Sequence, residues 1–192
     1  MIYALLAFVL CASPGAGMAD SIEQTFEFDC DVSAGKASDW VGTVVPRLQH
    51  VKGSVELLEP RDHERWWPVA SVFLFQGAQQ VGLQLFRDRQ QQDKLQVAAL
   101  RPESEGGRSV LTSVPWKGLP IVFELSVKES GDVELTVAGK ATLLGVKDMD
   151  ARKLALSCST AQFKFKDVVV RSERTQQGVA ADRRENAAPA ER

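Results

Sequence analysis

Carboxylates are the first residues to consider in this chain of 192 residues, because a suitably spaced pair can hydrolyse a glycosidic bond. Retaining glycosidases hold their two carboxyl groups about 5 Å apart, and inverting ones hold them further apart. Within one strand the pair must be two or four residues apart, because alternate side chains share a face. Glu134 stands alone in its expected strand, whereas Glu56 and Glu59 are three apart and face opposite ways. The sequence therefore favours a protein without catalysis.

Asp148 and Asp150 do have the right spacing, but residues 145–150 have the composition of a loop. Carboxylate oxygens on a loop suit a calcium ion, although acidic residues also occupy turns for solubility and local hydrogen bonds. These two residues are weak calcium candidates, and no other cofactor is expected. His50 and His63 have no partner at the spacing of a structural zinc site.

Tryptophans in loops are the other residues that could bind something. Trp66 and Trp67 lie in a polar segment bounded by Pro60 and Pro68, and Trp116 lies beside Lys117 in a connection that contains proline and glycine. Such rings can stack on sugars or fill a partner's pocket. Alternatively, they can be structural and close the open edges of the sheets at the end of the sandwich. If the chain binds a ligand, the predicted residues are Trp66, Trp67 and Arg65, followed by Trp116 and Lys117.

The elements that must position these residues are β-strands. Residues 121–128 and 133–138 alternate apolar and mostly polar side chains around a Gly/Asp turn, which predicts an antiparallel hairpin with one buried face. Further strands are expected at 20–29, 53–58, 69–75, 79–87, 95–100, 108–114, 152–158 and 162–170.

Two interruptions modify this strand pattern. Residues 31–51 contain Gly35, Gly42 and Pro46 and are expected to form an irregular crossing, and a change of apolar parity at Asp167 predicts a bulge. About ten strands in one domain predict an all-β fold, a two-sheet antiparallel β-sandwich or jelly roll.

The two ends of the chain have a different composition. Residues 1–19 contain an apolar run too short for a bilayer, which needs about 20 residues, followed by small residues at Gly17 and Ala19. This pattern predicts a signal peptide and a periplasmic or secreted protein without a membrane span. Residues 20–173 are then the sandwich domain, and residues 174–192 are an expected disordered polar tail.

Cys30 and Cys158 each lie on the apolar parity of an expected strand. In an exported protein, one inward-facing pair predicts a disulfide. Closing so long a loop contributes about 4–5 kcal/mol in the chain-entropy model. The alternative is two buried thiols that act as small apolar residues.

The segments 123–142 (FELSVKESGDVELTVAGKAT) and 154–170 (LALSCSTAQFKFKDVVV) resemble the concanavalin A-like lectin/glucanase superfold, in its laminin-G and 3-keto-disaccharide-hydrolase-like sense. The resemblance implies a jelly roll whose first and last strands are neighbours, which would bring Cys30 near Cys158. Members often carry Asn-Gly where this chain has Ala138-Gly139. Lectins of the superfold usually use an asparagine, and the only one here is Asn186 in the tail, so a legume-type sugar site is not expected.

The net charge and its distribution limit the classes of partner that the sequence predicts. The net charge of −2 is mixed along the chain with no basic stripe, so nucleic acid is not expected as a partner. The sequence predicts an exported non-catalytic binding module for a polysaccharide, another glycan or an envelope component. The alternatives are a periplasmic or extracellular protein-interaction or structural domain with an envelope protein as partner, and a glycoside hydrolase-like enzyme.

Export predicts that residues 1–19 are removed. Mass spectrometry of the protein secreted by a bacterial host should give an intact mass that begins at Asp20. An Ala19→Arg variant should remain uncleaved, because the peptidase needs a small residue at the cleavage site. Secreted protein that retains Met1 would contradict the prediction.

Overall fold

The computed structural model describes residues 21–36, 39–87, 90–102, 107–117 and 119–174, with the backbone alone for residues 39–41. The expected signal peptide, residues 1–19, and residues 175–192 of the expected tail lie outside this description. Among the described residues there are twelve strands and no helix long and apolar enough to cross a membrane.

The twelve strands form two sheets of six strands each. Their bounds are β1 (Ser21–Asp31), β2 (Asp39–Val44), β3 (Leu48–Pro60), β4 (Val69–Gln76), β5 (Gln79–Arg87), β6 (Lys94–Leu100), β7 (Arg108–Pro115), β8 (Ile121–Val127), β9 (Val133–Val137), β10 (Lys140–Leu143), β11 (Lys153–Ser159) and β12 (Ala161–Glu173). Sheet A has the order β1-β12-β3-β8-β9-β10, and sheet B has the order β2-β11-β4-β5-β6-β7.

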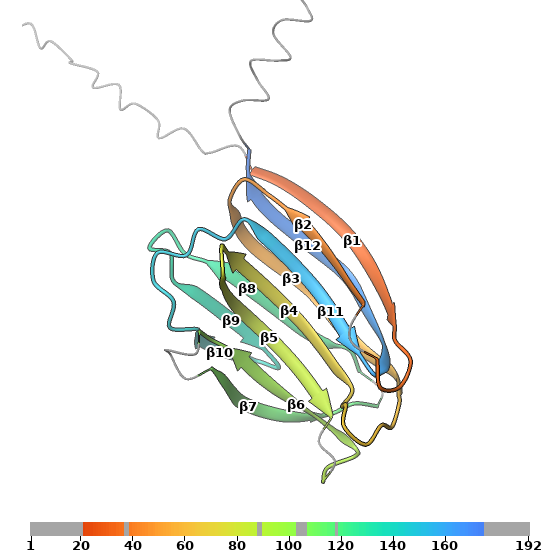
Figure 1. The fold of residues 1–192 in the computed structure, drawn as a ribbon. Coiled ribbons are helices and arrows are strands. Elements are labelled where there is room, and N and C mark those ends of the chain that lie inside the picture. The colour runs from red at the N-terminus through yellow and green to blue at the C-terminus, as the bar shows by residue number, and fades with distance from the viewer. Residues whose placement is uncertain (1–20, 37–38, 88–89, 103–106, 118, 175–192) are drawn as a thin grey trace, which may run out of the picture.

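The two sheets lie face to face as layers of a sandwich (Figure 1). Every paired neighbour is antiparallel. The prediction of an all-β, two-sheet antiparallel β-sandwich of the jelly-roll kind is therefore confirmed. A chain folded this way presents loops at both ends of the sandwich and one outer face on each sheet, and these are the places where a site can form.

Alternation in the sequence creates the core between the layers. Sheet A contributes large rings, Phe123, Phe163 and Phe165, and sheet B contributes aliphatic side chains such as Leu74 and Leu83, all fully buried. Each such side chain contributes about 1.5–3 kcal/mol when it leaves water. The same alternation turns every second residue outward, so the inner faces fix which side chains the outer faces carry.

The strand predictions hold best in the C-terminal half. The expected hairpin is β8–β9, with Leu125 opposite Leu135 and Phe123 opposite Val137. The bulge predicted at Asp167 is confirmed, because the pairing of β12 with β3 shifts there and Asp167 has a φ of 49°.

Two strand assignments from the sequence were wrong. Residues 31–51, expected as an irregular crossing, contain β2 and the beginning of β3, and β10 was not expected at all. Both β2 and β10 are edge strands. β1 and β7 are edge strands too and were predicted, but β2 and β10 have only six and four residues, too few for an alternating pattern to stand out.

The predicted disulfide joins Cys30 on β1 to Cys158 on β11. It crosses the core and links sheet A to sheet B, over a sequence separation of 128 residues. Strand β1 pairs with β12, as the resemblance implied. The bridge therefore joins the two layers at the edge where the chain begins.

Replacement of both bridge residues, Cys30→Ser and Cys158→Ser, should lower the free energy of unfolding by about 2–5 kcal/mol, because the unfolded chain regains the freedom of the open loop. Urea denaturation followed by tryptophan fluorescence measures this. Dithiothreitol is the control: it should destabilise the parent protein and leave the double variant unchanged. Equal stability of parent and double variant would contradict the prediction.

Candidate functional site

The outer face of sheet A is charged and internally paired. Across neighbouring strands Lys166 lies 2.8 Å from Glu56, and the His50 Nε2 atom lies 2.9 Å from Glu124. The hydrogen bond with His50 lowers the pKa of Glu124, and the hydrogen bond with Glu56 raises the pKa of Lys166. Such exposed pairs contribute about 0–1 kcal/mol each. The charged side chains of this face are thus paired with one another and exposed to water.

Glu124 on β8 and Glu134 on β9 also belong to this face. Glu124 also accepts a hydrogen bond from Ser126, and Glu134 pairs with Lys128 at 3.4 Å. Ser126 stands directly opposite Glu134 on the neighbouring strand. Both carboxylates are thus engaged by basic or hydroxyl side chains.

The outer face of sheet B has a different chemistry. Within its strands there is no glutamate, and Asp39 is the one aspartate, whose side chain lies outside the description. Its outward positions carry small residues, amides and rings. Several of them are almost fully covered although they point away from the core: among them, Ser71 is 3% exposed, Phe86 5% and Ala98 0%. Neighbouring outward side chains must therefore lie across them.

A stack of planar side chains provides that cover. The Trp67 ring stacks on Phe86 with centroids 6.2 Å apart and an interplanar angle of 23°. From β7, the Arg108 guanidinium lies over the same Phe86 ring, 4.6 Å from its centroid. Cation–π contacts of this kind contribute about 0.5–1 kcal/mol at exposed sites. The ring of Phe86 is therefore held between an indole and a cation.

The Gln84 amide extends this stack along β5. Its Nε2 atom donates to the Ser71 hydroxyl at 3.3 Å, and its Oε1 atom accepts from Arg108 at 3.1 Å. We call the five residues Trp67, Phe86, Arg108, Gln84 and Ser71 the sheet B strip. Their side chains fix one another's orientation before any ligand arrives.

Strand register brings the strip together. Gln84 is paired with Ser71 on β4 and with Ala98 on β6, and Phe86 follows two residues later on the same face. Between them and the far end of β5 lies Gly82, where any Cβ would run into the Val72 carbonyl. A glycine is therefore required at position 82 on this face, between the strip and the far end of β5.

A second cation–ring pair occupies the other end of the same face. The Lys153 Nζ atom lies 5.3 Å from the centroid of the Phe75 ring, and Phe73 is tilted against Phe75 at 5.8 Å. Ala155, paired opposite Phe73, adds a small residue beside them. Rings and cations thus recur along the face.

The predicted tryptophans meet at one end of the sandwich, beside the strip. The Gln92 carbonyl accepts hydrogen bonds from the Arg87 Nε atom and the Trp116 Nε1 atom, both at 2.9 Å. Gln92 and Arg87 also line a small pocket with Trp66 and Trp67. That pocket holds about 40 Å³, room for little more than one water molecule. A sugar ring would have to bind on the open surface.

The individual predicted residues differ in their accessibility. Trp66 is 48% exposed, whereas Trp67 is half-buried on Phe86. Lys117 lies over the Trp116 ring at 5.1 Å. Arg65 is exposed, and its backbone N–H donates to His63. Trp66, Trp67 and Trp116 are thus brought together, with Trp66 the most accessible ring.

Four residues of the strip were not predicted from the sequence: Phe86, Arg108, Gln84 and Ser71. The alternation in 79–87 places Gln84 and Phe86 outward, and that signal could have been used. Their meeting with Ser71 and Arg108 depends on register across four strands, which no local pattern contains.

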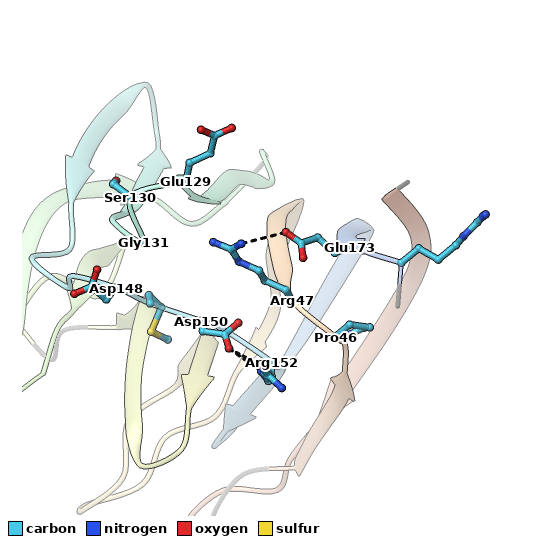
Figure 2. A pocket seen from close by; sticks show the side chains of 11 residues that line it. Pro46, Arg47, Glu129, Ser130, Gly131, Asp148, Asp150, Arg152 and Glu173 are labelled. Atoms are coloured by element: carbon cyan, nitrogen blue, oxygen red, sulfur yellow. Dashed lines mark hydrogen bonds and ion pairs between the residues drawn. The ribbon is translucent and has the colours of Figure 1, made fainter. Parts of the chain in front are cut away.

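The opposite end of the sandwich holds a larger hollow, of about 620 Å³, lined mainly by charged residues (Figure 2). Arg47 pairs with Glu173 at 3.2 Å, and Arg152 pairs with Asp150 at 2.7 Å. Asp148 lies in the same hollow. Nowhere in the described ranges do three His, Cys, Asp or Glu side chains gather to hold a metal. Calcium at Asp148 and Asp150 stays a prediction.

Comparison with known proteins concerns the fold alone. No protein-family model matches the chain, and no curated protein matches it. Among solved structures, the chain is similar to an alginate lyase from Pseudomonas aeruginosa, with 17% identity, 67% of this chain and 66% of that chain covered, and a TM-score of 0.48. The chain therefore spans just under two thirds of the length of that lyase.

Two other solved structures are also similar to the chain. A Bacillus licheniformis β-glucanase has 6% identity, with 78% of this chain and 79% of that chain covered and a TM-score of 0.48. A carbohydrate-binding module from Bacillus subtilis, CBM66, has 8% identity, coverage of 81% and 98%, and a TM-score of 0.43. A glucanase and a carbohydrate-binding module are thus among the solved structures to which this chain is similar, and they identify no ligand for it.

Two glycines provide a matched test of how the charged hollow is built. Gly131 and Gly139 have φ values of 79° and 74°, so alanine should cost about 1–2 kcal/mol of backbone strain at either position. A Cβ at Gly131 would also run into the backbone of Asp148, whereas none of the described atoms lies within 4 Å of a Cβ at Gly139. Urea denaturation should therefore show Gly131→Ala to be the more destabilising substitution. Equal losses would contradict this packing.

Proposed function

We propose that this protein is an exported, non-catalytic module that binds carbohydrate on the outer face of sheet B, with Trp66 at the end of that face. The observation that carries the proposal is the sheet B strip, in which Trp67, Phe86 and Arg108 are stacked and Gln84 is fixed by two hydrogen bonds. Such a surface has the two properties that a sugar requires.

The first property is chemical. A sugar ring has apolar C–H faces and hydroxyl edges, so it is bound by aromatic rings together with a few well-placed donors and acceptors. Trp66 offers a ring that is 48% exposed, and Gln84 and Arg108 offer an amide and a guanidinium beside the buried rings. The predicted aromatic residues and the strip form one continuous stretch of surface through Trp67.

The second property is preorganisation. Binding costs less entropy when the side chains of the site are already ordered. The Trp116 and Arg87 side chains share the Gln92 carbonyl, and Gln84 is held between Ser71 and Arg108. A ligand therefore meets donors and rings that need not be immobilised on binding.

The absence of catalysis is proposed on the distribution of carboxylates. Hydrolysis of a glycoside commonly needs two carboxyl groups beside the bond, and the strands of sheet B supply only Asp39. At the tryptophan end, Asp62 pairs with Arg87 at 3.3 Å. Export is supported by the Cys30–Cys158 bridge, because disulfides persist in oxidising compartments.

Trp66→Ala tests the proposal. The full chain should be retained by at least one of three insoluble polymers, cellulose, chitin or cell-wall peptidoglycan, and Trp66→Ala should weaken this retention about tenfold, as expected when an exposed anchoring tryptophan is lost. Val122→Ala is the control, because Val122 is an exposed apolar residue on sheet A. Both variants should keep the parent melting temperature. Retention that is unchanged in Trp66→Ala would exclude the assigned surface.

A second candidate function is the docking of an envelope protein. It is favoured by an apolar hollow of about 550 Å³ near the beginning of β8, where Leu119 is 77% exposed and Val122 is 66% exposed. Exposed apolar patches of this kind often mark interaction sites. Co-purification from envelope extracts that is lost in Leu119→Asp, together with no retention on any polymer, would favour this function.

A further inference from the structure

Building on the proposed function, we propose that the ligand of the sheet B face is an anionic polysaccharide, one whose sugars carry carboxylate or sulfate groups, and that Arg108 selects it with the help of Lys153. The inference rests on the distribution of charge between the two sheets, on the way Arg108 is held, and on the position of the second cation.

The acidic side chains of the strands lie in sheet A. Apart from Asp39, these residues are Glu23, Glu27, Asp29, Asp31, Glu56, Glu59, Glu124, Glu134, Asp167 and Glu173. The strands of sheet A also carry the basic residues Lys52, Lys140, Lys164, Lys166 and Arg171, whereas those of sheet B carry Arg87, Lys94, Arg108 and Lys153 with almost no carboxylates among them. The sheets of a sandwich pack about 10 Å apart, so side chains on the two outer faces are further apart than the screening length of about 8 Å in physiological salt. An anion on sheet B therefore meets few carboxylates from the strands of its own face.

Arg108 is held in an orientation that suits the binding of such an anion. Its guanidinium lies over the Phe86 ring and donates a hydrogen bond to Gln84. A guanidinium has five N–H donors in a rigid fork that matches carboxylate and sulfate oxygens. Within the described ranges no carboxylate lies within ion-pair distance of Arg108, and Glu103 and Glu105 lie outside those ranges. Its remaining donors can therefore serve a ligand.

Lys153 provides a second point of contact on the same face. Its ammonium lies over Phe75, and Phe75 is paired with Gln80, six residues before Phe86 on β5. At about 3.4 Å per residue, the two cation–ring pairs are roughly 20 Å apart along the strands. A polymer that reaches both makes the second contact at a high effective concentration. An extended chain with repeated negative charges fits this arrangement better than a single acidic sugar.

Two matched pairs of polymers test the inference with the full chain. Polygalacturonate is compared with its carboxyl-reduced form, and dextran sulfate with dextran, by affinity electrophoresis. At least one anionic member should bind at least tenfold more tightly than its neutral counterpart and weaken at about 0.5 M NaCl, where charges are screened. The pair that responds distinguishes a carboxylate ligand from a sulfate ligand.

Arg108→Gln should weaken binding to the anionic polymer about tenfold or more, as expected for the loss of hydrogen bonds to a charged group. Arg171→Gln removes the same charge from sheet A, where Arg171 pairs with Glu23, and should change binding less than twofold. Arg108→Lys keeps the charge without the fork and should give an intermediate loss. Retention of the parent melting temperature establishes that each variant is folded.

The outcomes separate this inference from the proposed function. Equal losses in Arg108→Gln and Arg171→Gln would mean that net charge alone attracts the polymer, and would overturn the assignment. Retention on neutral polymers that depends on Trp66, without any preference for anionic ones, would overturn the inference and leave the proposed function standing. Failure to bind any polymer would overturn both.

Discussion

The burial of one apolar face from each sheet is the constraint on which the rest of this structure depends. Because strand side chains alternate, the choice of Phe163 and Phe165 or of Leu83 and Leu85 for the core also decides which residues face water. The outer faces contribute little to this packing and are free to differ in chemistry. The outer face of sheet A carries cross-strand ion pairs, and the outer face of sheet B carries rings, amides and small residues.

This division has an energetic logic. Exposed ion pairs are individually weak, but a mixed and paired surface keeps a sheet soluble without attracting a particular ligand. The sheet B strip instead buries Phe86 under Trp67 and Arg108, so part of its stability comes from contacts among outward-facing side chains. A surface that is already packed loses little freedom when a ligand settles on it. The same contacts that stabilise the face therefore prepare it for binding.

Much of the fold could be predicted because alternation is a local signal: the β8–β9 hairpin, the bulge at Asp167 and the inward placement of Cys30 and Cys158 all follow from neighbouring residues. Strands β2 and β10 could not be predicted, since runs of six and four residues contain too few alternating positions to stand out from a loop. The site was predicted in part. Trp66 and Trp67 are conspicuous in a polar loop, but the contacts around Gln84 join strands whose register is a property of the whole sheet.

Strand β1 begins directly beside the last residue of β12, with Ser21 paired to Glu173. These strand ends lie at the opposite end of the sandwich from the connection between β3 and β4 (Figure 1), which contains Trp66 and Trp67. The thirteen residues of β12 separate the two ends by about 40 Å at 3.3 Å per residue. A tether, label or solid support attached through either Ser21 or Glu173 would consequently hold the protein in one orientation. Trp66 would then lie at the end of the sandwich away from the support. The outer face of sheet B, which runs between the two ends, would stay open to a polymer.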